Sequence, residues 1–256
     1  MASLDIRILG LLVFGLFFGV TSFFKGLKWI KEKREIEDIP TSEIRSIAMG
    51  LVEIYGEVVP IKGKILKSPL SNNDCVYFKF TIEEERGSGK NRHWEVIKRG
   101  NAEENFLVRD QTGEVLVNPE GADIDIPLDF QFQSGWGKDP PQTIVSFLKN
   151  NNLSFEGFLG INKKMRFKEY YLAPGDHAFV MGTAGDNPFI GETQAKSETE
   201  DIMIQKGDTG QNYYISDRSK KDVLNEFRNK VFLGIYGGAA LSTAMLFIIF
   251  LYFGLI

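Results

Sequence analysis

The sequence has 256 residues and a formal net charge of −4 at pH 7, with 30 Lys and Arg against 34 Asp and Glu. This length is typical of one or two domains. The negative balance argues against a nucleic-acid partner, because a protein that neutralises phosphates needs a basic surface. One Cys and two His cannot supply the four ligands of a structural zinc ion, and the single Cys75 excludes an intramolecular disulfide. We therefore expect no metal site, no cofactor and no nucleic acid.

An uncharged run of 17 residues occupies positions 8–24. It is at the short end for a transmembrane helix, which needs about 20 residues, and Arg7 can snorkel to extend it. The alternative is a cleaved signal peptide, for which Val20 and Ser22 stand at a suitable cleavage position. A signal peptide carries its positive charge before the apolar run, whereas here Asp5 balances the preceding cation and the other cations follow. We predict an uncleaved membrane anchor.

The second apolar run, residues 231–256, has 26 residues without a charged side chain. As a helix it is about 39 Å long, enough to cross a hydrocarbon core of about 30 Å. We therefore predict transmembrane helices over residues 6–26 and 231–256. A juxtamembrane helix is expected over residues 27–39, ended by Pro40. Another is expected over residues 219–230, which either continues into the second span as one helix or joins it flexibly.

Between the helices, residues 40–217 have the pattern of a β domain. Around Phe78 and Phe80 apolar side chains recur at every second position, which is typical of a strand with one buried face. Residues 105–117 predict a hairpin around a polar turn. A short amphipathic helix is predicted as an insertion near residues 140–150. Short strands at this spacing favour a mainly β fold, barrel or sandwich-like, flanked by two transmembrane helices.

Cationic residues lie on the sides of both spans that face the middle domain. They are Lys25, Lys28, Lys31, Lys33 and Arg34 after the first span, and Arg218, Lys220, Lys221, Arg228 and Lys230 before the second. Cytoplasmic flanks of membrane helices are enriched in Lys and Arg. The pattern therefore predicts a two-span protein of the cell membrane whose middle domain is cytoplasmic.

The sequence contains no nucleophile elbow, phosphate-binding loop or dinucleotide fingerprint, so no catalytic residue is predicted. The candidate binding residues are Glu83 and Glu84 in an acidic cluster, and His93 with Trp94 at the start of a predicted strand. Each pair has a simpler interpretation: the carboxylates as a solvated strand end, and the second pair as a packed indole beside a surface imidazole. Cys75 is a weak nucleophile candidate, because the sequence places no evident base beside it.

Small residues recur four positions apart in both spans, as Gly15 with Gly19 and as Gly234 with Gly238 and Ser242. Residues i and i+4 share a helix face, and small faces let helices approach closely in lipid. The simpler interpretation is that glycine is common in membrane helices. The two rows either meet within one chain or join two chains. Gly15 and Gly238 each lie eight residues from opposite ends of their spans, and this offset favours a parallel homodimer through the small residues of the second span.

Several short motifs occur in the middle domain. They are Leu66-Lys67-Ser68-Pro69-Leu70-Ser71, Cys75-Val76-Tyr77-Phe78, Glu83-Glu84, His93-Trp94, the run from Phe106 to Val117, Pro119 with Gly121 and Ala122, the run from Glu169 to Asp176, and Tyr213-Tyr214-Ile215-Ser216-Asp217. Together they resemble the GIDE domain, also called the BAM or "beside a membrane" domain. The resemblance covers about residues 40–230, and the flanking spans agree with the layout of that family.

Eukaryotic members of this family are membrane-anchored ubiquitin ligases of mitochondria and plastids, in which a RING follows the second span. A RING holds two zinc ions on eight Cys or His ligands, and this sequence has three such residues. The resemblance therefore implies the anchored sensing or substrate-contacting domain and not the ligase chemistry, as in short prokaryotic members, and we expect no ligase activity of this chain alone. In mitochondrial members the domain lies between the two membranes, which disagrees with a cytoplasmic domain.

Three functions follow from these observations. The first is a non-catalytic membrane protein that binds a protein or lipid partner beside the bilayer. The second is a subunit of a ubiquitin-like modification system, an E3-ligase type of complex whose catalytic chain is separate. The third is a scaffold that works by self-association in the membrane.

Overall fold

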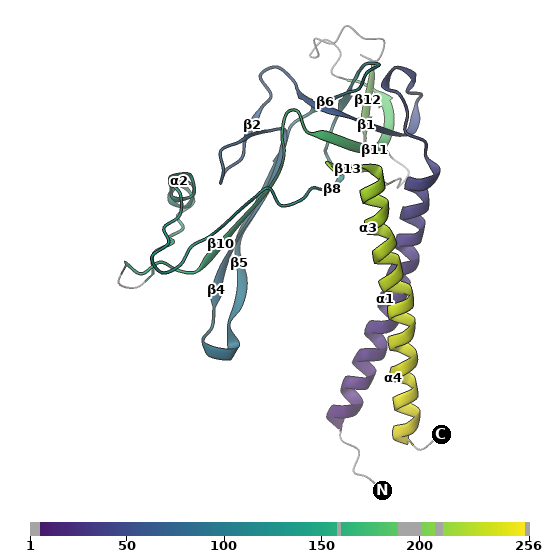
Figure 1. Ribbon diagram of the computed structural model, residues 1–256, viewed down its shortest axis with the longest axis vertical. Coiled ribbons are helices and arrows are strands. Elements are labelled where there is room, and N and C mark those ends of the chain that lie inside the picture. Colours follow the sequence, from purple (N-terminus) through teal and green to yellow (C-terminus); the bar gives the residue numbers. More distant parts are fainter. Residues whose placement is uncertain (1–5, 158–159, 189–200, 208–211, 254–256) are drawn as a thin grey trace. The chain divides into compact units, whose positions relative to one another are not determined.

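The computed structural model describes residues 6–157, 160–188, 201–207 and 212–253. Contacts divide the chain into two compact units, a helical unit of Met1–Pro40 with Lys220–Ile256 and a β unit of Thr41–Ser219. The helical unit is held by helix–helix contacts, and the β unit has apolar clusters of its own (Figure 1).

The helical unit consists of two long helices. They are α1 (Ile6–Asp38), and α3 (Lys220–Phe232), which continues through a π-helical turn, η4 (Leu233–Gly237), into α4 (Gly238–Phe253). The second juxtamembrane helix therefore continues into its span as one helix. Arg7–Asp38 and Lys220–Phe253 are long and apolar enough to cross a membrane. Large side chains such as Phe14 (68% exposed) and Leu233 (69% exposed) point outward, which suits a hydrocarbon solvent better than water.

Helices α1 and α4 lie side by side, and small residues form their contact (Figure 1). A Cβ atom built on Gly19 would lie 2.5 Å from the Ser242 Oγ and 3.0 Å from the Gly238 carbonyl oxygen. A Cβ atom on Gly26 would lie 2.8 Å from the backbone nitrogen of Ile235. The two backbones therefore touch where side chains are missing, which is how helices gain contact in lipid.

The glycines of the two spans meet in another pairing than the homodimer prediction assumes. Gly19, not Gly15, packs against Gly238, and Gly15 faces Met245. Counted from the cationic flanks on the same side of the membrane, Gly19 and Gly238 lie six and eight residues deep, so antiparallel spans bring them to a similar level. The homodimer stays a prediction, and it would use a face of the second span that the first span of the same chain covers here.

A closed five-stranded barrel forms one part of the β unit. Its strands are, in spatial order, β1 (Gly50–Pro60), β6 (Phe106–Arg109), β7 (Glu114–Val117), β12 (Ile202–Gln205) and β11 (His177–Asp186), which pairs back with β1. Strands β7 and β12 run parallel, and the other barrel neighbours are antiparallel. β13 (Tyr214–Ser216) adds to β11, β8 (Asp123–Asp125) adds to β13, and a 3-10 turn, η1 (Ile44–Ser46), precedes β1. Apolar side chains such as Ile54, Val108 and Val180 fill the interior. The predicted β fold and the hairpin at 105–117 are confirmed.

A separate antiparallel sheet contains four strands. They are, in spatial order, β5 (His93–Glu103), β4 (Tyr77–Arg86), β10 (Met165–Leu172) and β9 (Phe130–Gln133). Helix α2 (Gln142–Asn150) has the predicted position, and its buried residues Ile144 and Leu148 share an apolar cluster with Phe80 and Phe167. A 3-10 turn, η2 (Gly89–Asn91), joins β4 to β5, and β2 (Leu66–Lys67) with β3 (Asp74–Cys75) forms a small ribbon.

The carboxylate of Glu169 joins this ribbon to the four-stranded sheet. Its side chain is fully buried on β10, where one oxygen accepts a hydrogen bond from the Leu70 N–H at 2.8 Å. The other oxygen accepts bonds from the Ser71 N–H at 2.9 Å and the Ser71 hydroxyl at 2.5 Å. A buried carboxylate is stable only when donors replace its water, and these three do so. The bonds hold the turn that places Leu70 in the apolar cluster beside Phe80.

We predict that Glu169→Gln destabilises the protein by about 2 kcal/mol, because an amide NH₂ then faces backbone donors. This loss corresponds to a decrease in the thermal unfolding midpoint of roughly 4–8 °C for a chain of this size. The measurement is thermal unfolding of the full-length protein in detergent. Glu120→Gln, at an exposed carboxylate, is the control and should leave the midpoint unchanged. An equal midpoint for the two variants would contradict the role of Glu169.

We also predict that the two spans of one chain can be linked. In a Cys75→Ser background, Gly15→Cys combined with Met245→Cys should form an intrachain disulfide on mild oxidation, because a Cβ atom on Gly15 lies 3.2 Å from the Met245 Cγ. The product is a monomer with altered gel mobility, and peptide mass spectrometry identifies the link.

The matched control for this crosslink replaces Gly10 instead of Gly15, because a Cβ atom on Gly10 would meet nothing within 4 Å. The Gly10→Cys and Met245→Cys pair should give no intrachain product. Crosslinked dimers from the Gly15→Cys and Met245→Cys pair, without the monomeric product, would show that the spans meet between chains.

Candidate functional site

The two faces of the four-stranded sheet differ in polarity. Side chains alternate along β4, so Phe80 and Ile82 point toward α2 and its apolar cluster, whereas Lys79, Thr81 and Glu83 point the other way. Register places the outward side chains of neighbouring strands beside them. We call this the open face: Lys79, Thr81, Glu83, Glu85, Trp94, Val96, Arg99, Asn101, Gln131, Gln133, Arg166 and Lys168.

A compact charged cluster lies at the centre of the open face. The Arg166 guanidinium lies 3.3 Å from the Glu83 carboxylate, and the Lys168 ammonium lies 3.1 Å from it. The same guanidinium is 4.0 Å from the centroid of the Trp94 ring, a cation–π distance. Arg166 is therefore held between an indole and a carboxylate, with little of its rotational freedom left to lose when it binds a ligand.

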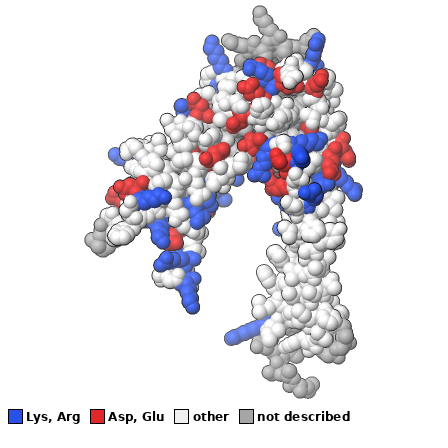
Figure 2. Space-filling model, in the orientation of Figure 1, with Lys and Arg blue, Asp and Glu red and all other residues white. Residues whose placement is uncertain are grey.

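Positive charge exceeds negative charge on and beside this face. Its cations are Lys79, Arg99, Arg166, Lys168 and the adjoining Lys164, and its carboxylates are Glu83 and Glu85, which both pair with cations. Lys79 and Arg99 are exposed and form no ion pair within the described part of the chain. Figure 2 shows Lys and Arg gathered along the arm that β4 and β5 form. The arrangement is suited to binding carboxylates or other anionic groups.

Strand β5 adds a second recognition element to the open face. Among the described strands it pairs only with β4, so the backbone groups of its outer edge have no strand partner. Such an edge can accept an additional extended segment by β-strand addition. The side chains Val96 and Arg99 of this strand are exposed and would contact such a segment.

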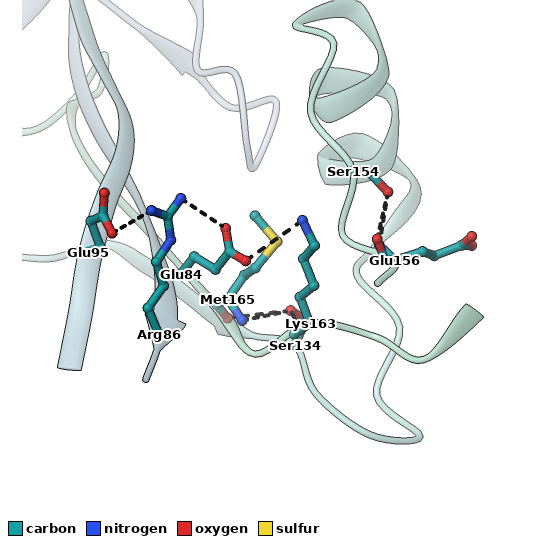
Figure 3. A network of polar contacts seen from close by, with 8 residues as sticks. All are labelled: Glu84, Arg86, Glu95, Ser134, Ser154, Glu156, Lys163 and Met165. Atoms are coloured by element: carbon teal, nitrogen blue, oxygen red, sulfur yellow. Dashed lines mark hydrogen bonds and ion pairs between the residues drawn. The ribbon is translucent and has the colours of Figure 1, made fainter. Parts of the chain in front are cut away.

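The four predicted binding residues do not form one site. Glu83 and Trp94 share the open face, where Arg166 bridges them. Glu84 lies on the opposite face, 3.8 Å from Arg86 and 3.7 Å from Lys163, in the network of Figure 3. His93 is exposed at the end of the hairpin, and its Nδ1 lies 3.2 Å from the Asn91 carbonyl oxygen.

Sequence reasoning missed the cations of the open face. Arg166 and Lys168 alternate with the buried Met165 and Phe167, the period of two that marks a strand with one polar face. That signal was present in the sequence. The strand partner that brings Arg166 to Glu83 is more than 80 residues away, so their contact was not predictable from local pattern.

Cys75 does not have the environment of a nucleophile. Its side chain is fully buried, and burial, with the nearby Glu169 and Asp74 carboxylates, raises its pKa to about 12. The thiol is therefore protonated at neutral pH and closed to solvent. Among the described residues, no group of three or more His, Cys, Asp and Glu side chains is placed to hold a metal ion.

A groove of about 510 Å³ on the barrel is a second, weaker candidate. The Tyr55 and His177 rings form part of its wall, with centroids 5.7 Å apart. Burial alone would raise the pKa of Asp110, but hydrogen bonds from Ile44, Thr112 and Gly113 lower it below its usual value. This carboxylate is therefore engaged by the backbone and side chains of its own turn and of the segment before β1.

Comparison with known proteins identifies one family. The GIDE family model, described as E3 ubiquitin ligase, matches residues 79–249, which include the four-stranded sheet, most of the barrel and most of the second span. No curated protein and no solved structure gave a match. Because the family model covers more than half of the sequence and the resemblance of the motifs agrees with it, the chain belongs to the GIDE family.

Proposed function

We propose that this protein is a two-span membrane protein whose GIDE domain binds an acidic segment of a protein partner through the open face. The observation that carries this proposal is the Arg166 guanidinium, held between Trp94 and Glu83 and flanked by the exposed cations Lys79 and Arg99. Charge-assisted hydrogen bonds to carboxylates are among the stronger polar contacts, and a preorganised guanidinium loses little entropy in forming them.

A purely structural role accounts for part of this cluster. Cross-strand ion pairs such as those of Glu83 with Arg166 and Lys168 stabilise a sheet by about 0.2–1 kcal/mol each. That role does not account for Lys79 and Arg99, which have no such pair within the described residues and leave an excess of positive charge in an acidic protein. Partner binding accounts for both groups of cations.

The family description names an E3 ubiquitin ligase. We infer that these 256 residues supply the anchored, partner-binding part of such a system and do not themselves carry out a transfer step. Two features support this inference: the sequence has three Cys and His residues where a RING needs eight, and the Cys75 thiol is buried and protonated. A self-associating scaffold is the alternative, and it would use the small-residue face of the second span that the first span of the same chain covers in the structure.

The partner proposal predicts that Lys79→Glu combined with Arg99→Glu removes a bound protein. Full-length tagged protein is crosslinked in its native membrane and purified, and its companions are quantified by mass spectrometry. Recovery of the specific partner should fall by about tenfold or more, because two charge-assisted contacts become repulsive.

Two controls accompany this experiment. Lys149→Glu changes an exposed cation on α2, away from the open face, and should retain the partner. The double variant Lys79→Arg and Arg99→Lys keeps both positive charges and should also retain the partner. Equal recovery with the double Glu variant and the wild type would refute partner binding at this face.

We further propose that the domain is cytoplasmic, because ten Lys and Arg residues flank it beside the two spans. In a Cys75→Ser background, Asn150→Cys on the exposed end of α2 should react with a membrane-impermeant maleimide only after cells are permeabilised. Ala2→Cys should react in intact cells. Labelling of Asn150→Cys in intact cells would reverse the orientation.

A further inference from the structure

One end of the four-stranded sheet brings three loops together. β4 ends and β5 begins there, with Met165 of β10 opposite Glu84. The Ser134 N–H after β9 bonds to the Met165 carbonyl oxygen, and Gly135 lies beside Lys164. We call this the distal end: the hairpin turn 87–92, the turn 135–138 and the segment 161–164.

The distal end exposes large apolar side chains. Trp136 is 90% exposed, the most exposed large apolar residue among those described, and Ile161 is 53% exposed. An indole in water is common at a binding surface and is especially favoured at the headgroup level of a bilayer. The turn that carries Trp136 is closed by a hydrogen bond from the Lys138 N–H to the Gly135 carbonyl oxygen, so this exposure belongs to a defined turn.

The distal end also contains cations. Lys90 and Arg92 lie in the hairpin turn, which contains no carboxylate and holds its shape through Gly87 and Gly89 at positive φ. Neither Lys90 nor Arg92 forms an ion pair within the described residues. Lys138 lies 5.1 Å from the Phe132 ring centroid. Figure 2 shows blue side chains at the tip of the arm formed by β4 and β5.

Except for the exposed Glu156, the carboxylates near the distal end have partners of their own. Figure 3 shows Glu84 between Arg86 and Lys163, and Glu95 pairs with Arg86 at 2.7 Å. The side chain of Glu156 extends away from this network. Asp139 accepts a hydrogen bond from the Asn162 amide at 2.6 Å, and Glu85 pairs with a lysine at 3.2 Å. Lys90 and Arg92 are therefore exposed cations of the hairpin turn without a carboxylate partner among the described residues.

We propose that the distal end binds the headgroup region of a bilayer containing anionic phospholipid, with the Trp136 indole at the level of the headgroups. Two Lys or Arg residues near an anionic surface contribute about 2 kcal/mol, too little for a free domain but enough for a tethered one. The spans that leave the domain at Pro40 and Lys220 keep it beside a bilayer, so this contact costs little further translational entropy. Charge sign, the exposed indole and the tether agree on lipid as the occupant.

The test uses full-length protein in vesicles of phosphatidylcholine with and without phosphatidylserine. Brominated lipids quench the fluorescence of tryptophans at the headgroup and upper acyl level. The contribution of Trp136 to this fluorescence, the Trp136 component, is the difference between the wild type and Trp136→Phe. We expect strong quenching of this component in phosphatidylserine vesicles. Lys90→Gln combined with Arg92→Gln should reduce it severalfold, whereas the control Lys149→Gln should leave it unchanged.

Two results would overturn the lipid proposal. One is a Trp136 component that is unquenched in both kinds of vesicle, as expected if the indole binds protein or stays in water. The other is quenching that is independent of phosphatidylserine and of Lys90 and Arg92, which would exclude headgroup charge as the cause. Neither result bears on the open face, because Lys79 and Arg99 are unchanged in these variants.

Discussion

The four-stranded sheet depends on a buried charge, the carboxylate of Glu169. Its position opposite Phe80 within β10 would be unfavourable for an ion without partners, and the turn at Leu70 and Ser71 supplies the three donors that it needs. The same bonds bring Leu70 into the apolar cluster, so one face of the sheet is closed by the ribbon and α2. Beside this apolar cluster, polar side chains such as Lys79, Glu83 and Lys168 lie on the opposite face, which forms the open face.

The pleat of the strands decides which residues can act together. Consecutive residues point to opposite faces, so Glu83 and Glu84 cannot form an acid–base pair, and His93 and Trp94 cannot share one contact surface. The residues that do meet come from different strands: Arg166 of β10 reaches Glu83 of β4 and Trp94 of β5. Reading a candidate site from neighbours in the sequence therefore fails in a β domain, even when individual residues are well chosen.

Local periodicity predicted much of the fold. The apolar runs of the two spans, the alternation around Phe80, the hairpin at 105–117 and the apolar spacing of Ile144 and Leu148 each contain their own signal. Barrel closure does not, because β1 pairs with β11, more than 100 residues away. The contact between the glycines of the two spans also could not be predicted from local pattern. Both rows of small residues are visible in the sequence, but which glycine faces which depends on how the antiparallel helices align.

Net charge gave the least guidance about surfaces. The chain is acidic as a whole, yet its open face and hairpin turn are basic, because the fold pairs carboxylates such as Glu83 and Glu84 with neighbouring cations and leaves other cations exposed. Charges interact over about 8–10 Å at physiological salt, so a ligand responds to this local arrangement and not to the sum over the chain. Arg166 is held between an indole and a carboxylate, whereas Lys90 and Arg92 are exposed in a turn without ion-pair partners among the described residues, so the two basic surfaces differ in how much of their geometry is fixed before a ligand binds.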